Sequence, residues 1–318
     1  MTVRTVRRAA LLAAFAILGL GAGRARAEDV ALTFDDLPQL ALTSDLDYAK
    51  TINNRLLAGL RHHHLPAIGF VVGSKLEEPD RPARVALLEA WLKAGQTLGN
   101  HTYDHGSLNR TPLPDYIADV QMDDDVLRPL LAAHRQKPEW FRHPYLETGE
   151  TTDIKQGFEA WLKAHGYRIA PVTLENADWM FAYPYDEAVQ KGDGAGVRRI
   201  RQEYLDYTAK CVVWYRAAAL ELLGRRPALV FLLHASRLNA DSIDGLADIL
   251  RRNGLKAVTL ERAMRDEAYT IPDDKPDMGG DEWLSRWADQ LHKPLPWTSF
   301  PEAPEDIVAA EKRLDTDP

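Results

Sequence analysis

Seven short apolar runs alternate with longer segments whose apolar residues recur every three or four positions. The runs are "VALTF" (30–34), "AIGFVVG" (67–73), "QTLGN" (96–100), "EWFRH" (139–143), "YRIAPVTL" (167–174), "ALVFLLH" (228–234) and "LKAVTL" (255–260). This alternation constrains the fold more than any other feature, because strands that alternate with helices form a parallel sheet covered by the helices. We therefore expect an α/β fold with about seven parallel strands, either a barrel or a doubly wound sheet.

The first 27 residues differ from the rest of the chain. Three Arg residues precede an apolar stretch, and the small residues of "ARA" (25–27) follow it, as in a secretory signal peptide that is cleaved after Ala27. The apolar stretch is shorter than the ~20 residues of a membrane span, so export to the periplasm or beyond is favoured over anchoring. We expect a barrel domain over 28–271 and a C-terminal tail over 272–318, where no periodicity is visible.

Composition restricts the possible partners. The chain has 318 residues, 45% of them hydrophobic, which is enough for one large core. Loss of residues 1–27 removes five Arg and no acidic residue, so the formal net charge changes from -8 to -13. Such an acidic protein disfavours nucleic acids and anionic lipids as partners and is expected to be soluble. Cys211 is the only cysteine, which excludes an intramolecular disulfide and a cysteine-based metal site.

Polar side chains gather where the predicted strands end. In chain order they are Asp35 and Asp36, His101 and His105, Arg142, Asp178 with Trp179, and His234. In a parallel α/β barrel the carboxyl ends of all strands meet at one rim, where active sites lie. A polar turn would explain any one of these groups, but core packing does not explain five such places at one rim. The sequence therefore predicts an active site there.

The adjacent carboxylates of Asp35 and Asp36 are unusual because neighbouring side chains of a strand point to opposite faces. Taken alone, "DDLP" is an ordinary turn. The "HTYDH" segment favours another interpretation, since His101 and His105 share one face if the segment is helical and can also converge on one ion from a loop. A carboxylate from another strand would complete a His, His, Asp site with open positions, as in hydrolytic metal sites.

The segments "TFDD", "HTYDH", "RHPY", "ENADW" and "FLLH" follow the order and approximate spacing of five motifs of a known family. Over residues 28–265 the sequence resembles the polysaccharide deacetylases, the carbohydrate esterases (family 4) that share the NodB homology domain. The resemblance implies a distorted (β/α) barrel and a divalent metal, usually Zn²⁺, with Co²⁺ or Mn²⁺ as alternatives. It also implies hydrolysis of an N-acetyl or O-acetyl group on an acetylated glycan.

The resemblance implies a role for each motif residue in this sequence. Asp36, His101 and His105 match the metal ligands, whereas Asp35 matches the base that takes a proton from the attacking water. The arginine of the third motif, Arg142, is expected to orient this base.

The remaining motif residues match the groups that handle the oxyanion and the leaving group. The backbone N–H of Tyr145 is expected to hold the oxyanion. His234 matches the general acid, and Asp178 is expected to set its tautomer and raise its pKa. Trp179 and Leu232 are expected to form a slot for the acetyl methyl group, although both types of residue also occur as plain core positions.

Leu37 and Leu146 stand where the family usually has glycine. We expect both at the rim, where a side chain in place of hydrogen narrows the groove or requires a different turn. Either effect favours a short oligosaccharide or a glycan end over a long polymer. Three functions are open: an N-deacetylase of chitin oligosaccharides or peptidoglycan, an O-acetyl esterase or small-substrate amidase, and a non-catalytic glycan-binding barrel. The complete set of a base, metal ligands and an acid disfavours the third function.

Overall fold

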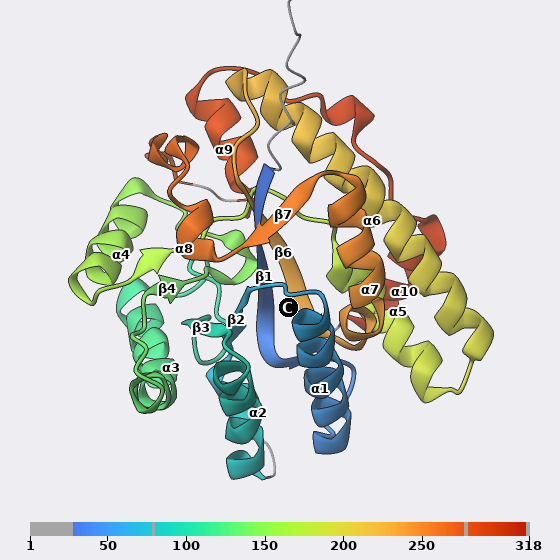
Figure 1. Cartoon of the computed structure of the whole chain (residues 1–318). Helices are drawn as coiled ribbons and strands as arrows, with labels where there is room; N and C mark the ends of the chain where they lie inside the picture. Colours follow the sequence, from blue (N-terminus) through green and yellow to red (C-terminus); the bar gives the residue numbers. More distant parts are fainter. Residues whose placement is uncertain (1–27, 78–79, 277–278, 316–318) are drawn as a thin grey trace, which may run out of the picture.

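The computed structural model describes residues 28–77, 80–276 and 279–315 (Figure 1). The predicted signal peptide over residues 1–27 lies outside this part of the chain. Within the described residues, every helix is too short or too polar to cross a membrane.

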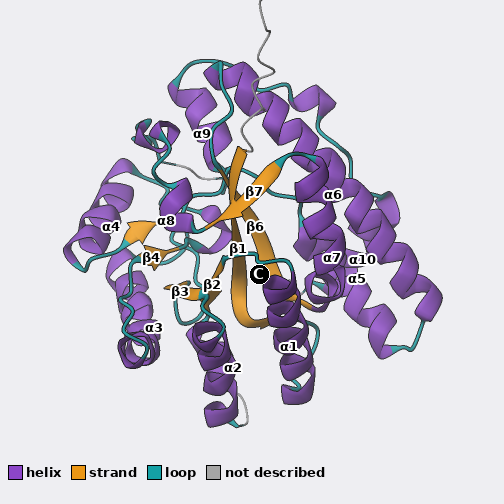
Figure 2. Cartoon of the chain, in the orientation of Figure 1, coloured by secondary structure: helices purple, strands orange, loops and turns teal. Residues whose placement is uncertain are grey.

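Seven parallel strands form one sheet in the order β5–β4–β3–β2–β1–β6, with β7 paired to β1. The strands are β1 (Glu28–Leu40), β2 (Ala67–Val71), β3 (Thr97–Asn100), β4 (Trp140–Phe141), β5 (Arg168–Ile169), β6 (Leu229–Ser236) and β7 (Leu255–Val258). Each falls within or around one of the seven apolar runs of the sequence. The sheet curls into a half-barrel surrounded by helices (Figure 2), which confirms the predicted distorted barrel.

The first strand of the chain is the middle strand of the sheet. Val30 is in register with Leu229 of β6 and with Ala257 of β7, so these two strands lie on opposite edges of β1. On the edge where β7 pairs with the first residues of β1, β2 pairs with β1 from Leu32 onward. After β5, Leu174 forms an isolated parallel bridge with Phe231 of β6, which brings the far side of the sheet back toward its other edge.

Ten α-helices and four short 3₁₀ helices cover the sheet in the described residues. The α-helices are α1 (Leu46–His62), α2 (Arg81–Lys93), α3 (Leu113–Ala133), α4 (Thr152–Ala164), α5 (Asp178–Gln190), α6 (Gly194–Leu223), α7 (Arg237–Arg252), α8 (Leu260–Ala263), α9 (Trp283–Gln290) and α10 (Glu305–Leu314). The 3₁₀ helices are η1 (Gly73–Leu76), η2 (Pro144–Leu146), η3 (Glu267–Thr270) and η4 (Trp297–Ser299).

Local sequence signals set several helix ends. The Asp45 side chain accepts a hydrogen bond from the Tyr48 N–H at the start of α1, and Asp193 caps the start of α6 in the same way. Helix α6 ends at Gly224, whose φ of 69° is the left-handed conformation that glycine adopts without cost. A short turn separates α6 from α5, which ends at Gln190.

The segment predicted as a tail packs against the domain. Trp283, Leu284 and Trp287 of α9 are buried in the main hydrophobic core, as is Ile307 of α10. Arg313 of α10 also forms two hydrogen bonds of 2.9 Å with Glu187 of α5. These helices have eight and ten residues, which is too short for a clear periodicity in the sequence.

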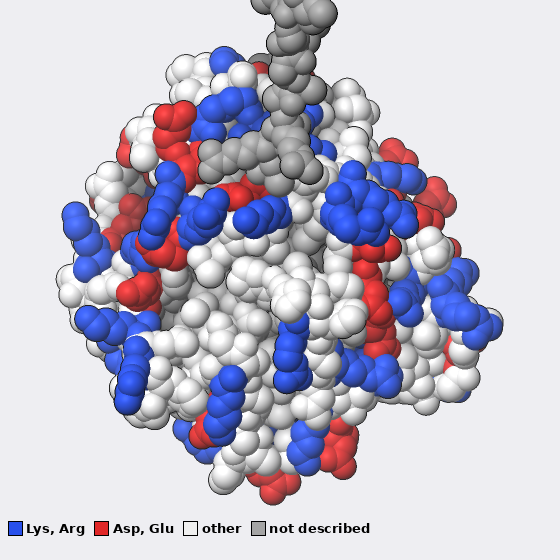
Figure 3. All heavy atoms as spheres, viewed as in Figure 1, with Lys and Arg blue, Asp and Glu red and all other residues white. Residues whose placement is uncertain are grey.

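Charged side chains are unevenly spread over the face seen in Figure 3. Basic and acidic residues are mixed around its margin, and the centre of this face is mostly uncharged. This is the face over which α1, α2 and β7 lie in Figure 1.

Candidate active site

Asp35 and Asp36 sit where β1 stops being regular. The pairing of β1 with β2 shifts register between Phe34 and Leu37, and Asp36 has a left-handed φ of 67°. This irregularity breaks the alternation of side chains, so both carboxylates face the same site. Asp35 Oδ2 and Asp36 Oδ1 each lie 3.7 Å from Nε2 of His101. The adjacent pair is therefore a feature of the site rather than an ordinary turn.

The two histidines of "HTYDH" approach Asp36 from a loop after β3, not from a helix. His101 Nδ1 lies 2.8 Å from the backbone oxygen of Arg142. Because a carbonyl oxygen only accepts, Nδ1 carries the proton and Nε2 presents its lone pair. His105 Nε2 lies 3.4 Å from Asp36 Oδ1. One ligand atom from each of the three side chains lies within 4.8 Å of the others.

The residues of this triad fit a divalent metal ion. Asp36 Oδ1 is buried and has no hydrogen-bond partner among the described residues, which is unfavourable unless a cation binds it. Burial alone would raise the pKa of Asp36, but Lys75 and the nearby histidines hold it well below its usual range. An ionised carboxylate with two imidazoles is a donor set that Zn²⁺, Co²⁺ and Mn²⁺ accept.

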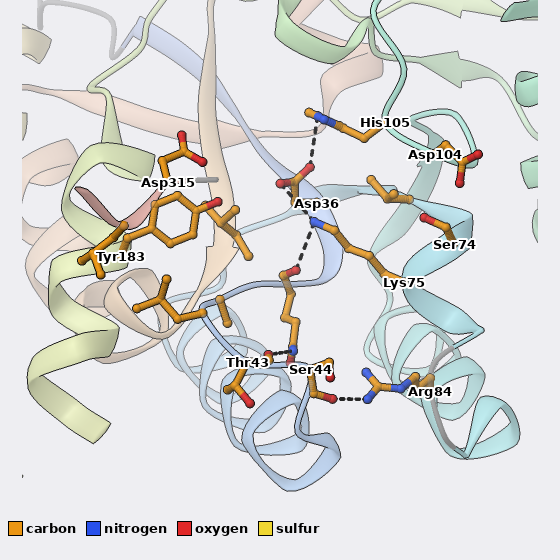
Figure 4. A pocket seen from close by; sticks show the side chains of 16 residues that line it. Asp36, Thr43, Ser44, Ser74, Lys75, Arg84, Asp104, His105, Tyr183 and Asp315 are labelled. Carbon is orange, nitrogen blue, oxygen red and sulfur yellow. Dashed lines mark hydrogen bonds and ion pairs between the residues drawn. The ribbon is translucent and has the colours of Figure 1, made fainter. Parts of the chain in front are cut away.

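Lys75 is also part of this site, although no motif of the sequence includes it. It comes from η1, and its Nζ lies 3.2 Å from Asp36 Oδ2 and 3.3 Å from the backbone oxygen of Gln39. Figure 4 shows Asp36 between Lys75 and His105, with Tyr183 across the pocket.

Arg142 lies behind Asp35. The guanidinium is fully buried, and its Nη1 lies 3.3 Å from Asp35 Oδ2. Nη2 donates to Thr33 Oγ1 at 3.1 Å, which fixes the guanidinium against β1. Burial raises the pKa of Asp35 to about 6, although Arg142 and His234 favour its ionised form. Arg142 thus lies where it can orient this carboxylate, and that role stays a prediction.

His234 stands on β6 directly beside Asp35, its register partner on β1. Its Nδ1 lies 2.7 Å from Asp178 Oδ1, and its backbone N–H donates to Asp178 Oδ2 at 2.7 Å. Burial opposes a charge on the imidazole, but the Asp178 carboxylate outweighs it and raises the pKa of His234 to about 9. The Nδ1 proton points to Asp178, so Nε2 is available to a substrate.

A cavity of about 340 Å³ connects these groups. Asp35, the three metal-site side chains and His234 line it, together with Tyr145, Trp179 and Leu232. Arg142 and Asp178 lie behind its wall. A second hollow, of about 560 Å³, adjoins the cavity and shares Asp36 and His105 with it (Figure 4). The structure thus brings the residues matched to metal, catalytic and slot roles to one place.

Residues 22–170 match the model of the family described as polysaccharide deacetylase. Over these residues the chain is similar to the polysaccharide deacetylases. Among curated protein sequences, none matches it significantly.

Solved structures of deacetylases share the fold. A polysaccharide deacetylase from Bacillus cereus is 18% identical, with a TM-score of 0.51, over 73% of this chain and 91% of the other. A peptidoglycan N-acetylglucosamine deacetylase bound to an N-hydroxybenzamide is 19% identical (TM-score 0.51; 75% and 91% covered). A mutant of a pseudoenzyme of carbohydrate esterase family 4 with restored activity is also 19% identical (TM-score 0.51; 75% and 68% covered).

The two departures from the family pattern have different structural outcomes. Leu37 is fully buried and lies against Gly69, where a Cβ would stand only 2.5 Å from Leu37 Cδ2. Leu37 therefore does not narrow the groove. The backbone irregularity at Asp36 turns the Leu37 side chain into the core, which corresponds to the alternative of a different turn. Leu146 does line the cavity, and it packs against Val172 and Leu232.

A hydrogen-bond network behind His234 was not predicted. Asn239 of α7 donates through Nδ2 to Asp178 Oδ2 and, at 2.8 Å, to the backbone oxygen of His234. Tyr204 of α6 donates to Asn239 Oδ1 at 2.6 Å. These residues hold the Asp178 carboxylate toward His234. Tyr204 sits within a long helix, and Asn239 lies in the first turn of α7, just after β6 ends. Neither belongs to one of the five motifs, so the sequence carries no signal for their roles.

Proposed function

We propose that this protein is a metal-dependent hydrolase that removes N-acetyl groups from a glycan such as chitin oligosaccharide or peptidoglycan. One observation carries the proposal. Asp35 and His234, a carboxylate and an Asp-paired imidazole, are register partners on adjacent strands and line the same cavity as the Asp36, His101, His105 triad. A base, an acid and a metal site are what hydrolysis of an amide requires.

The chain's own residues support the following division of labour. A divalent ion held by Asp36, His101 and His105 would polarise the acetyl carbonyl and make a water molecule more acidic. Asp35, oriented by Arg142, takes a proton from the attacking water as the new C–O bond forms. The backbone N–H of Tyr145 donates to the oxygen that becomes negative.

Collapse of the tetrahedral intermediate breaks the C–N bond and needs a proton on the leaving nitrogen. His234 is placed to supply it from Nε2, because Nδ1 is held by Asp178 at 2.7 Å. Its raised pKa, about 9, keeps the imidazole protonated at neutral pH. The products are acetate and a free amine, after which Asp35 and His234 return to their starting protonation states.

The size of the cavity supports a limited substrate length. About 340 Å³ is at the small end of the ~300–1,000 Å³ of small-molecule sites. The adjoining hollow of about 560 Å³ provides space for a neighbouring unit. We therefore favour a short oligosaccharide or a glycan end.

The features of residues 1–27 support the further proposal that the protein acts in the periplasm or outside the cell.

The test is acetate release from a panel of acetylated glycans, with and without a chelator. The panel contains chitin oligosaccharides, peptidoglycan fragments and O-acetylated xylan. We expect release from an N-acetylated member, loss of activity after chelation, and recovery with Zn²⁺, Co²⁺ or Mn²⁺. Release from xylan alone would instead identify an O-acetyl esterase. Binding without release from any member would indicate a glycan-binding barrel.

A further inference from the structure

The turn that carries the proposed oxyanion donor has a conformation that side chains rarely adopt. Tyr145 and Leu146 are both left-handed, with φ of 55° and 57°. Two successive non-glycine residues of this kind persist only where surrounding groups fix the backbone. The groups that do so here come from the C-terminal segment of the chain.

Arg286 of α9 holds this turn from the side away from the cavity. Its Nη2 donates to the backbone oxygen of Leu146 at 2.9 Å, and its Nη1 donates to Thr148 Oγ1 at 3.0 Å. The side chain is only 5% exposed and does not line the cavity. A planar guanidinium with several donors can bind two neighbouring acceptors in fixed directions, which an ammonium group cannot do equally well.

The guanidinium is itself fixed in place. Nε donates to the backbone oxygen of Asp281 at 2.8 Å, and the group lies 4.6 Å from the centre of the Trp283 ring. Asp273 balances the charge, with Oδ2 at 3.4 Å from Arg286 Nη1 and 2.8 Å from the buried Nζ of Lys155. Arg286 is therefore a rigid, charge-compensated support rather than a mobile surface residue.

The chain approaches the same turn at a second point. A Cβ at Gly280 would stand 2.1 Å from the backbone oxygen of Tyr145, so only glycine permits this contact. Three residues later, the N–H of Trp283 donates to the backbone oxygen of Val172 at 2.6 Å. This bond ties the start of α9 to the segment after β5. The C-terminal segment thus contacts the turn at Tyr145 and at Leu146, and is also bonded to Val172.

We propose that Arg286 is a positioning residue, which holds the Tyr145–Leu146 turn so that the N–H of Tyr145 points at the developing oxyanion. The catalytic part rests on the proposed function, because it assumes that Tyr145 binds an oxyanion. The positioning part concerns the backbone of 143–149 and can be measured without any substrate.

The experiment compares Arg286→Met and Arg286→Lys with the unchanged protein. Arg313→Met is the matched control, because Arg313 is also a C-terminal arginine but pairs with Glu187, on α5. The readouts are kcat and KM per folded, metal-loaded protein, and amide hydrogen exchange of a peptide that covers residues 143–149.

We expect Arg286→Met to lower kcat by about 10- to 100-fold, somewhat less than complete removal of an oxyanion donor, with KM changed less than about threefold. Hydrogen exchange over 143–149 should become faster in Arg286→Met. Arg286→Lys should give values between those of Arg286→Met and the unchanged protein. Arg313→Met should change neither kcat nor exchange. If Arg286→Met does not fold, Arg286→Lys carries the comparison.

Two results would overturn the proposal. One is a loss of thermal stability with unchanged kcat and unchanged exchange over 143–149. The other is an equal loss of kcat in Arg313→Met, which would show a general effect of the C-terminal segment. If the unchanged protein releases no acetate from any glycan, the proposed function fails by itself, and the exchange data alone decide whether Arg286 positions the turn.

Discussion

Asp36 divides its two carboxylate oxygens between different partners: Oδ2 lies 3.2 Å from Lys75 Nζ, while Oδ1 faces His101 and His105. Lys75 therefore leaves one oxygen for a metal ion and places a positive charge next to the site. Two opposing effects follow. The ion pair orients the Asp36 carboxylate, whereas the positive charge of Lys75 repels a bound cation. In a buried site, where screening is weak, we expect the repulsion to dominate.

Lys75→Met should therefore bind Zn²⁺ more tightly than the unchanged protein, by about tenfold or more. Competition with a chelator of known affinity measures this directly and needs no substrate. Lys75→Arg keeps the charge and serves as the control, with affinity close to that of the unchanged protein. Weaker binding by Lys75→Met would show that orientation of Asp36 outweighs charge.

Variants of the two adjacent carboxylates should differ in how much metal they bind. Asp35→Asn should lose turnover but keep its metal, because Asp35 pairs with Arg142 and is assigned no ligand role. Asp36→Asn should lose both, since an amide oxygen is a much weaker ligand than a carboxylate. Elemental analysis and acetate release give the two quantities. Asp104→Asn, in the same loop as His105 but exposed, is the control for metal content. Equal metal loss in the first two variants would contradict these roles.

The pH dependence of kcat should report on His234. An acid must be protonated to act, so activity should fall as the pH rises through the pKa of His234, which Asp178 raises to about 9. In Asp178→Asn the anion that favours the imidazolium is gone, and the alkaline limb should move to lower pH. His234→Ala should lower kcat by roughly 10²- to 10⁴-fold.

Asp186→Asn is the control for the Asp178 variant. Asp186 is a buried carboxylate of the same helix, but it accepts from the Tyr48 hydroxyl at 2.7 Å and not from His234. The alkaline limb of kcat in Asp186→Asn should lie at the same pH as in the unchanged protein. An alkaline limb that does not move in Asp178→Asn would assign the acid to another group.

The slot formed by Trp179 and Leu232 should limit the length of the acyl group that the protein removes. Leu232 lines the cavity, so Leu232→Ala should raise the rate on N-propionyl relative to N-acetyl substrates by about tenfold, the usual worth of one methylene in an apolar pocket. The substitution should also cost about 2–4 kcal/mol of unfolding free energy. Leu233→Ala provides the comparison, since Leu233 is buried in the main core. It should lose stability without a change in the rate ratio.

The strands were predictable because most of them are buried apolar runs, and the polar groups at their ends stand out against those runs. The two-residue strand β5 is an exception, since Arg168 is exposed and Ile169 only half-buried. Parallel strands place their carboxyl ends at one rim, so the sequence alone is enough to group Asp35, His101 and His234. The local backbone conformation was harder to predict from the sequence. Asp36 has a left-handed φ although it is not glycine, and this conformation turns the Leu37 side chain away from the rim.

Supporting residues were the least predictable. Lys75, Asn239 and Arg286 each contact a residue of the site, but they come from a short 3₁₀ helix, the first turn of α7 and the short α9. Their roles depend on contacts between segments far apart in the chain. A periodic pattern reports which face of an element is buried, and carries no information on which polar partner lies opposite.

The central place of β1 has a consequence for how the protein matures. Thr33 of β1 donates to the backbone oxygen of Phe231, a partner 198 residues later in the chain. Contacts of such separation form late and slow folding. All three metal-site residues are synthesised early, yet the strand that carries Asp36 lacks its β6 neighbour until residues 229–236 arrive. A chain cut short before β6 would expose an apolar strand edge and be prone to aggregation or proteolysis, not a smaller enzyme with partial activity.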